Sequence, residues 1–373
     1  MTTGRLSKEA AEEAVRVLNE HSGNMTAAAD ALGLPRGTFQ SRIKAAALQG
    51  ITADAPKSVY GTSTLYGKDG GVMLRWVKEN AKNRSPEQWA QYIKDAFADI
   101  GSLPKVKAPD GKLRKDLLTV YPIGDHHVAM YAWGEEVGAD YDIKIADELL
   151  ASAMTHLVSV APDTERALII SVGDFFHVDN LKNQTSRSGH TLDVDTRYAA
   201  MIRAGVRMMR TAIDCALSKH KHVTVVNAIG NHDDIGSMWL SLALAQYYEK
   251  NPRVSIETKP GKFHYYRHGE VLIGVTHGDT GKPEKLQSVM AADRPGDWGL
   301  TKFRYWITGH IHTRKVLEFP GVMWETFRTL APGDAWANAA GYRSGRDMTA
   351  IVFSATHGEI ARHRFDVSML EAA

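Results

Sequence analysis

Five short blocks of Gly, Asp, Asn and His residues constrain this chain more than any other feature. Each block follows a run of residues with high strand propensity, such as Ala167–Val172 or Val271–Val275, which is typical of buried parallel strands. In open α/β sheets, functional side chains gather at the carboxyl ends of such strands. Asp, Asn and His are also donors to divalent metals, so the sequence predicts a metal site assembled from several loops. The blocks are Gly124-Asp-His-His127, Gly173-Asp174, Gly230-Asn-His-Asp-Asp234, Thr276-His-Gly-Asp279 and Gly309-His-Ile-His312.

The length of 373 residues allows one large domain and one or two small ones. We divide the chain into a small all-α domain at 1–50, a basic linker and helical connector at 51–116, and an α/β domain at 117–373. In the last domain, periodicity predicts helices at about Ile143–Val160, Val194–Ser218, Ser237–Lys250 and Pro283–Ala292. The tail predicts antiparallel strands at Val316–Phe319, Gly321–Thr329, Met348–Ala355 and Ile360–Phe365.

The first fifty residues predict three helices: one from an N-cap at Ser7 to about His21, then Met25–Leu32 and Thr38–Ala47. The stretch from Met25 to Lys44 resembles a helix-turn-helix with its turn at Gly33. The third helix would offer polar side chains to a DNA groove or backbone, although a protein-docking or purely structural unit fits the same pattern. Those side chains are Arg36, Thr38, Gln40, Arg42 and Lys44.

The connector is basic, with more Lys and Arg than Asp and Glu. Residues 51–70 have the composition of a linker, and Ser85–Phe97 predicts an amphipathic helix with Pro86 at its first position. Its apolar stripe of Trp89, Tyr92, Ile93 and Phe97 favours packing over base stacking. The lysines and arginine of 105–115 could track a phosphate backbone or form a solvated connector.

Composition excludes several classes of protein. Cys215 is the only cysteine, so the chain forms no intramolecular disulfide and no thiolate zinc cluster. No apolar stretch approaches the ~20 residues of a membrane span, and the N-terminus lacks the apolar core of a signal peptide. We therefore expect a cytoplasmic protein with no membrane partner.

In their order along the chain, the five blocks resemble those of the calcineurin-like metallophosphoesterases: D-x-H, G-D, G-N-H-[DE], a His in an H-G block, and G-H-x-H. The resemblance covers most of residues 119–315. It implies an α/β fold in which a metallophosphoesterase-type β-sandwich is flanked by helices. It also implies two divalent cations that share Asp174, with Mn²⁺ suited to the mixed donors and Fe, Zn, Ni and Mg as alternatives. One cation would bind Asp125, His127, Asp174 and His312, and the other Asp174, Asn231, His277 and His310.

The resemblance also assigns roles beside the metals. His232 matches the general acid of the family, which protonates the leaving oxygen, and Asp233 or Asp234 would orient it. His126 lies between two ligands and is expected to point away from them, into the second layer or to the surface.

One block points to a branch of the family. Gly173-Asp-Phe-Phe-His177 resembles the G-D-L-F-H form of the SbcD-type DNA repair nucleases, where His177 would support phosphate or a metal. Arg197 could clamp a phosphate, whereas Asp193 or Asp195 would instead cap the following helix.

We therefore expect a metal-dependent phosphodiesterase, with a DNA nuclease as the leading function and DNA as the partner. A small-molecule or cyclic-nucleotide phosphodiesterase or a phosphoprotein phosphatase is the alternative, because the site alone does not choose a substrate. The near-neutral α/β domain weighs against a nuclease, which usually surrounds its cleft with positive charge, while the intact ligand set weighs against a non-enzymatic DNA-binding regulator. The sequence is compatible with a homodimer and with a partner ATPase.

Overall fold

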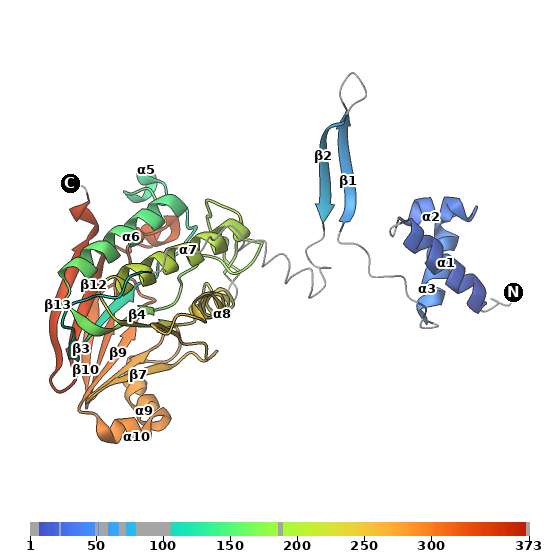
Figure 1. Cartoon of the computed structure of the whole chain (residues 1–373). Coiled ribbons are helices and arrows are strands. Elements are labelled where there is room, and N and C mark those ends of the chain that lie inside the picture. The colour runs from blue at the N-terminus through green and yellow to red at the C-terminus, as the bar shows by residue number, and fades with distance from the viewer. Residues whose placement is uncertain are drawn as a thin grey trace. The chain divides into compact units, whose positions relative to one another are not determined.

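The computed structural model describes residues 7–21, 24–48, 51, 59–66, 72–79, 106–185 and 189–370. The chain divides into two compact units, Met1–Ala98 and Asp99–Ala373, which are treated separately here (Figure 1). The predicted helix at Ser85–Phe97 and Lys105 lie outside the described residues. Among the helices that are described, none combines the length and the apolar character needed to cross a membrane.

Three helices form the start of the first unit, as predicted: α1 (Lys8–Glu20), α2 (Met25–Ala31) and α3 (Arg36–Leu48). The Ser7 side chain accepts a hydrogen bond from the Ala10 amide and so caps α1, and Asn24 caps α2 in the same way. Phe39 is fully buried against α1 and α2, and Leu34 and Ile43 pack beside it. The apolar pattern of the sequence therefore identifies the core of this small helical unit.

A hairpin occupies part of the segment that the sequence predicts as a linker. Strands β1 (Val59–Tyr66) and β2 (Val72–Glu79) pair antiparallel. The Gly, Ser, Pro and Lys residues of 51–70 indicate a linker, although β1 itself contains Val, Tyr and Thr, which favour strands. This part of the linker prediction was wrong.

Unit 2 contains two mixed sheets. The six-stranded sheet has the order β13-β12-β3-β4-β5-β6, with β3 to β6 parallel and β12 and β13 antiparallel at one edge. Its strands are β3 (Arg114–Ile123), β4 (Thr164–Ser171), β5 (His222–Asn227), β6 (Val254–Ile256), β12 (Asp347–Ser354) and β13 (Gly358–Asp366).

The five-stranded sheet has the order β10-β11-β9-β8-β7, with β11, β9 and β8 parallel and the two outer strands antiparallel. The parallel pairing of β11 with β9 differs from the antiparallel tail that the sequence predicts. The strands are β7 (His264–His268), β8 (Val271–Val275), β9 (Phe303–Thr308), β10 (Lys315–Phe319) and β11 (Val322–Thr326).

The two sheets pack face to face, and helices cover their outer faces. Leu118, Ile170 and Val226 of the first sheet share one buried cluster with Ile273 and Ile307 of the second. Helices α6 (Ile143–Val160), α7 (Tyr198–Leu217) and α8 (Gly236–Tyr248) lie on the six-stranded sheet, and α9 (Pro283–Asp293) packs on the other (Figure 1). The predicted α/β sandwich flanked by helices is confirmed. Short helices follow at α5 (Gly134–Val137), α10 (Pro295–Leu300) and α11 (Ala335–Ala339).

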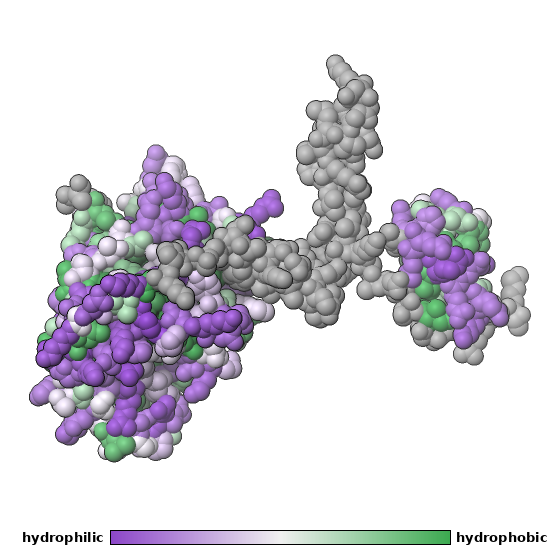
Figure 2. Space-filling view, in the orientation of Figure 1, coloured by the Kyte–Doolittle hydropathy of each residue, from purple (hydrophilic) through white to green (hydrophobic). Residues whose placement is uncertain are grey.

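The surface of unit 2 gives no large apolar face on the side shown in Figure 2, where hydrophilic residues dominate and apolar ones lie in small separate groups. The apolar side chains are instead buried mainly between the layers. This packing holds the strand ends in fixed positions for the loops that follow them.

A buried histidine links β3, β4 and the end of α7. The Tyr121 hydroxyl lies 2.8 Å from His220 Nε2, and His220 Nδ1 lies 3.1 Å from the Thr164 carbonyl oxygen. In the neutral ring, Nδ1–H donates to Thr164 and Nε2 accepts from Tyr121. Burial lowers the pKa of His220 to about 4, because the charged ring would lose its hydration.

We predict that His220 makes stability pH-dependent. The unfolded chain binds this proton near pH 6.5 and the folded chain only near pH 4, so unfolding becomes easier as the pH falls between these values. The slope of the unfolding free energy against pH, measured by urea unfolding, should be smaller in His220→Gln than in the wild type by up to about 1.4 kcal/mol per pH unit. The exposed His357→Gln is the matched control and should keep the wild-type slope; equal slopes in all three proteins would contradict the prediction.

Candidate metal centre

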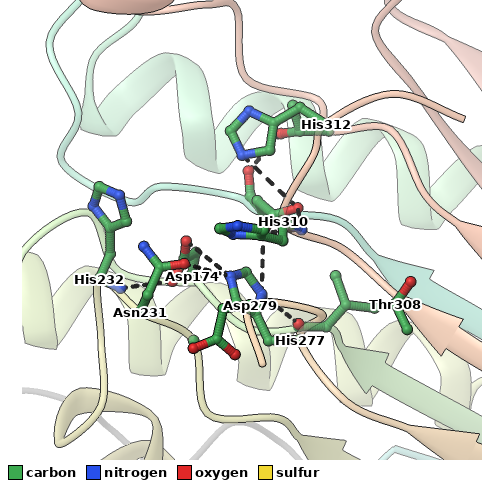
Figure 3. A network of polar contacts seen from close by, with 12 residues as sticks. Asp174, Asn231, His232, His277, Asp279, Thr308, His310 and His312 are labelled. Atoms are coloured by element: carbon green, nitrogen blue, oxygen red, sulfur yellow. Dashed lines mark hydrogen bonds and ion pairs between the residues drawn. The ribbon is translucent and has the colours of Figure 1, made fainter. Parts of the chain in front are cut away.

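The five sequence blocks meet at one edge of unit 2, where parallel strands of both sheets end. Asp125 follows β3, Asp174 follows β4, and Asn231 follows β5. From the other sheet, His277 follows β8, and His310 and His312 follow β9. Figure 3 shows Asp174, Asn231, His277, His310 and His312 converging from different loops. The sandwich therefore brings together residues that lie up to 187 positions apart, from Asp125 to His312.

His277 lies at the centre of the first group of donors. Its Nε2 is 3.1 Å from Asp174 Oδ2 and 3.0 Å from Asn231 Oδ1, and its Nδ1 is 3.3 Å from Asp125 Oδ1. The His310 ring lies 5.0 Å away, centroid to centroid. One donor atom each from Asp174, His277 and His310 lie within 4.8 Å of one another. This group contains the predicted ligands of the second cation.

A second group is built around His127. Its Nε2 lies 3.2 Å from His312 Nε2, and its Nδ1 lies 3.2 Å from His177 Nδ1. His312 Nε2 is in turn 3.9 Å from Asp125 Oδ2. Donor atoms of His127, His177 and His232 also lie within 4.8 Å of one another. The structure thus joins all seven predicted ligands in one continuous cluster and adds His177 to it.

Glycines let the backbone approach the carboxylates. A Cβ at Gly230 would overlap the Asp174 side chain and amide, and one at Gly309 would lie 2.6 Å from Asp125 Oδ2. These distances are shorter than any real side-chain contact, so only glycine fits at either position. The glycines of these two blocks are therefore required by the carboxylates of two other blocks.

The backbone of the ligands themselves is strained. Four of the non-glycine residues with positive φ are predicted ligands: His127 (46°), Asp174 (48°), His310 (71°) and His312 (50°). Left-handed conformations of this kind cost about 1–3 kcal/mol each and persist where the surroundings hold them in place. Their concentration at one sheet edge indicates a functional site.

Electrostatics separates the two groups. Burial disfavours protonation of His277, but the Asp174 and Asp125 carboxylates outweigh it and raise the pKa of His277 to about 10. Burial also raises the pKa of Asp174, yet the charge and hydrogen bond of His277 bring it well below its usual range. In the other group, burial and then neighbouring imidazoles lower the pKa of His127 well below its usual range and that of His177 to about 3. The imidazoles of His127 and His177 are therefore neutral.

Asp233 does not orient His232 through its side chain. The Asp233 carboxylate accepts hydrogen bonds from the amides of Gly230, Asp174 and Phe176, at 3.1, 3.2 and 3.1 Å. His232 Nδ1 instead lies 2.9 Å from the His177 carbonyl oxygen, and the His232 amide donates to Asp174 Oδ1. The predicted orienting role of Asp233 was wrong: it ties two ligand loops together, and a backbone carbonyl positions the His232 ring.

Other predicted residues lie outside the cluster. Arg197 is exposed at the start of α7, and no hydrogen bond or ion pair links it to a ligand within the described residues. Asp195 caps α6, not α7, by accepting from the Ile143 amide. His126 points away from the ligands, as predicted, but it is buried against Phe175 and the Ala146 carbonyl, so its surface placement was wrong.

Two supporting residues escaped the sequence analysis. Asp179 accepts hydrogen bonds from the Ile235 and Gly236 amides at 2.6 and 2.8 Å, which fixes the start of α8 beside His232. Asp279, at the end of the His277 block (Figure 3), forms an ion pair with Lys262 at 2.8 Å. An acidic residue five positions after Asp174 is the only sequence signal for the first, and the second lies in its block without an assigned role.

The cluster fits divalent cations. It combines buried carboxylates, an amide oxygen and imidazoles, the donor types that Mn²⁺, Fe and Zn accept. His177 Nε2 is buried and has no hydrogen-bond partner in the described part of the chain, and the facing imidazoles of His127, His177 and His312 cannot satisfy one another fully. A cation would supply the missing partner.

Comparisons with other proteins add little. No protein-family model and no curated protein matches the chain in sequence. Among solved structures, Vps29 of Entamoeba histolytica in complex with Zn²⁺ is 14% identical, with 66% of this chain and 98% of that one covered and a TM-score of 0.29. A predicted phosphoesterase of Streptococcus pneumoniae is 10% identical (68% and 99% covered, TM-score 0.29), and GAP50 of Plasmodium is 14% identical (68% and 89% covered, TM-score 0.33). TM-scores this low carry no conclusion about this chain, so the assignments rest on its own residues.

We predict that Gly230→Ala weakens metal binding at least about 10-fold, because the new methyl group displaces Asp174, the carboxylate shared by both predicted ligand sets. Isothermal titration with Mn²⁺ measures the change, and near-UV circular dichroism shows whether the variant is folded. Gly299→Ala is the matched control, since nothing lies within 4 Å of that position. Wild-type affinity in a folded Gly230→Ala protein would contradict the prediction.

Proposed function

We propose that the protein is a dinuclear-metal-dependent phosphodiesterase of the calcineurin-like metallophosphoesterase type. The observation that carries the proposal is the cluster itself. Carboxylate, amide and imidazole donors from five strand ends converge on Asp174, and no structural need of the sandwich explains their number or their strained backbone. Cations bound there would supply Lewis acidity toward a phosphate ester and lower the pKa of water.

The side chains of this chain divide the remaining work. Asp125, His127, Asp174 and His312 would hold one cation, and Asp174, Asn231, His277 and His310 the other. His232 is only partly buried, and its Nδ1 faces the His177 carbonyl oxygen. A proton on Nδ1 donates to that carbonyl, and Nε2 on the opposite side of the ring is not used by this hydrogen bond. With a hydrogen bond fixing the ring, His232 is suited to transfer a proton at Nε2 to the leaving oxygen.

We propose DNA as the substrate, with the helices α1 to α3 as a DNA-binding unit. Arg36, Arg42 and Lys44 of α3 form no ion pair within the described residues, and α3 has no acidic residue. Helix α1, by contrast, pairs its cations with Glu12 and Glu20. Helix α1 is acidic, with four Glu against one Lys and one Arg, so the cations of α3 are the ones in this pair that are suited to contact phosphates. The Gly173–His177 block, which resembles that of the SbcD-type nucleases, supports the same substrate.

We predict that His232→Ala lowers kcat for Mn²⁺-dependent cleavage of linear DNA by about 10²–10⁴-fold, because the leaving oxygen loses its proton donor. Bis-p-nitrophenyl phosphate, whose leaving group needs no proton, should lose less. The matched control is His357→Ala, an exposed histidine in the hairpin between β12 and β13, which should cleave as the wild type does. Turnover of the small diester without cleavage of DNA would point to a small-molecule phosphodiesterase instead.

We predict that Arg42→Ala combined with Lys44→Ala weakens DNA binding to a similar extent for all sequences. The slope of log K against log salt should fall by about 2, since each cation that contacts a phosphate releases one counterion. Arg16→Ala on α1, whose partner is Glu20 at 2.6 Å, serves as the control. An unchanged salt slope in the double variant, with normal hydrolysis of the small diester, would show that α3 does not contact DNA.

A further inference from the structure

Four large aromatic side chains are exposed on two segments that leave the metal edge of unit 2. Tyr131 and Trp133, which are 46% and 50% exposed, follow the Asp125–His127 block by a few residues. Trp336 and Tyr342, at 69% and 64%, are the most exposed of the four and lie on and just after α11. Aromatic side chains of this size are normally buried in a core. Their exposure here indicates a surface that binds a ligand.

Hydrogen bonds anchor both segments beside the metal ligands. The Met130 amide donates to the His127 carbonyl, which turns the first segment sharply after that ligand. The second segment continues from β11, and there the Thr329 hydroxyl donates to the Asp125 carbonyl at 2.5 Å. Because n residues span at most ~3.6 Å × n, Trp336 lies within about 25 Å of this contact and Tyr131 within about 15 Å of His127.

The two segments are also tied to each other. The Asn338 side chain on α11 donates to the Glu136 carbonyl on α5 at 2.8 Å, and these two helices pack together. The Trp336 and Tyr342 rings pair at a centroid distance of 5.7 Å and an angle of 37°. The Trp336–Tyr342 pair, together with the exposed Tyr131 and Trp133 just ahead of α5, is here called the aromatic platform.

A cation accompanies the aromatic pair. The Arg343 guanidinium donates to the Asn338 and Tyr342 carbonyls at 3.1 and 2.8 Å, which holds it beside Tyr342. It is exposed, and no carboxylate pairs with it among the described residues. The acidic Glu135 and Glu136 of α5 would repel phosphate. The platform therefore combines rings for stacking with one exposed cation, Arg343.

We propose that the aromatic platform stacks the bases of a single-stranded DNA end and guides its phosphates past Arg343 toward the metal centre. This inference rests on the proposed phosphodiesterase function and narrows its substrate to unpaired strands. Exposed aromatic rings combined with a cation are the pattern by which proteins bind single strands without sequence preference, because every base presents a π-face. A duplex, whose bases are already stacked on one another, gains nothing from such a surface.

The test measures binding of the full chain to two fluorescent oligomers of equal length by anisotropy, in EDTA so that nothing is cleaved. One is oligo(dT), and the other carries abasic sites and thus the same phosphates without bases. Trp336→Ala combined with Tyr342→Ala should weaken binding of oligo(dT) roughly 5- to 100-fold and leave binding of the abasic oligomer unchanged. The single variant Trp336→Phe should keep most of the affinity for oligo(dT) that the single variant Trp336→Ala loses. The control is Leu300→Ala, an exposed apolar residue (62%) ahead of the amino end of β9.

Other outcomes overturn the proposal. Equal affinity of the wild type for the two oligomers, or an equal loss for both in the double variant, would show that no base stacks there. A wild-type dimer that the double variant converts to a monomer in sedimentation would assign the platform to a second copy of the chain. Either result leaves hydrolysis of bis-p-nitrophenyl phosphate intact, whereas failure of the phosphodiesterase function would abolish that hydrolysis in every protein tested.

Discussion

The close approach of backbone to two buried carboxylates determines the architecture of this site. Asp125 and Asp174 lie at adjacent strand ends, and loops from other strands pass so near them that a side chain at Gly230 or Gly309 would collide with a carboxylate. The amides of His232 and His310 donate to these carboxylates at 2.8 and 3.0 Å. Backbone donors therefore fix the carboxylates before any metal is bound, which is the rigid support that a catalytic constellation needs.

The sandwich supplies this precision through its topology. Parallel strands in both sheets end at the same edge, so short loops from β3, β4, β5, β8 and β9 reach one point from several directions. The energetic cost of this arrangement is the left-handed backbone conformation of four ligands, His127, Asp174, His310 and His312. The buried apolar cluster between the sheets offsets that strain, and a substitution far from the ligands that loosens the sandwich would disturb the site.

Much of this arrangement could be predicted from the sequence because its signals are local. A run of Val and Ile followed by Gly and a metal donor marks a strand end, and the bounds of α6 coincide with the predicted Ile143–Val160. What the sequence could not show depends on contacts between distant segments. The role of Asp233 as a bridge between loops, the burial of His126, and the pairing of β11 with β9 all require knowing which segments are neighbours. The hairpin of β1 and β2 was missed because the Gly, Ser, Pro and Lys residues around β1 gave the whole segment the composition of a linker.

The most direct test of the account is the number and position of bound metals. Crystals of the full chain grown with Mn²⁺ and measured near the manganese absorption edge would show each ion as an anomalous peak. The account predicts two peaks about 3.5–4 Å apart, both in contact with Asp174, with His232 outside coordination distance of either. A single peak enclosed by His127, His177 and His232, or no peak at saturating Mn²⁺, would contradict it.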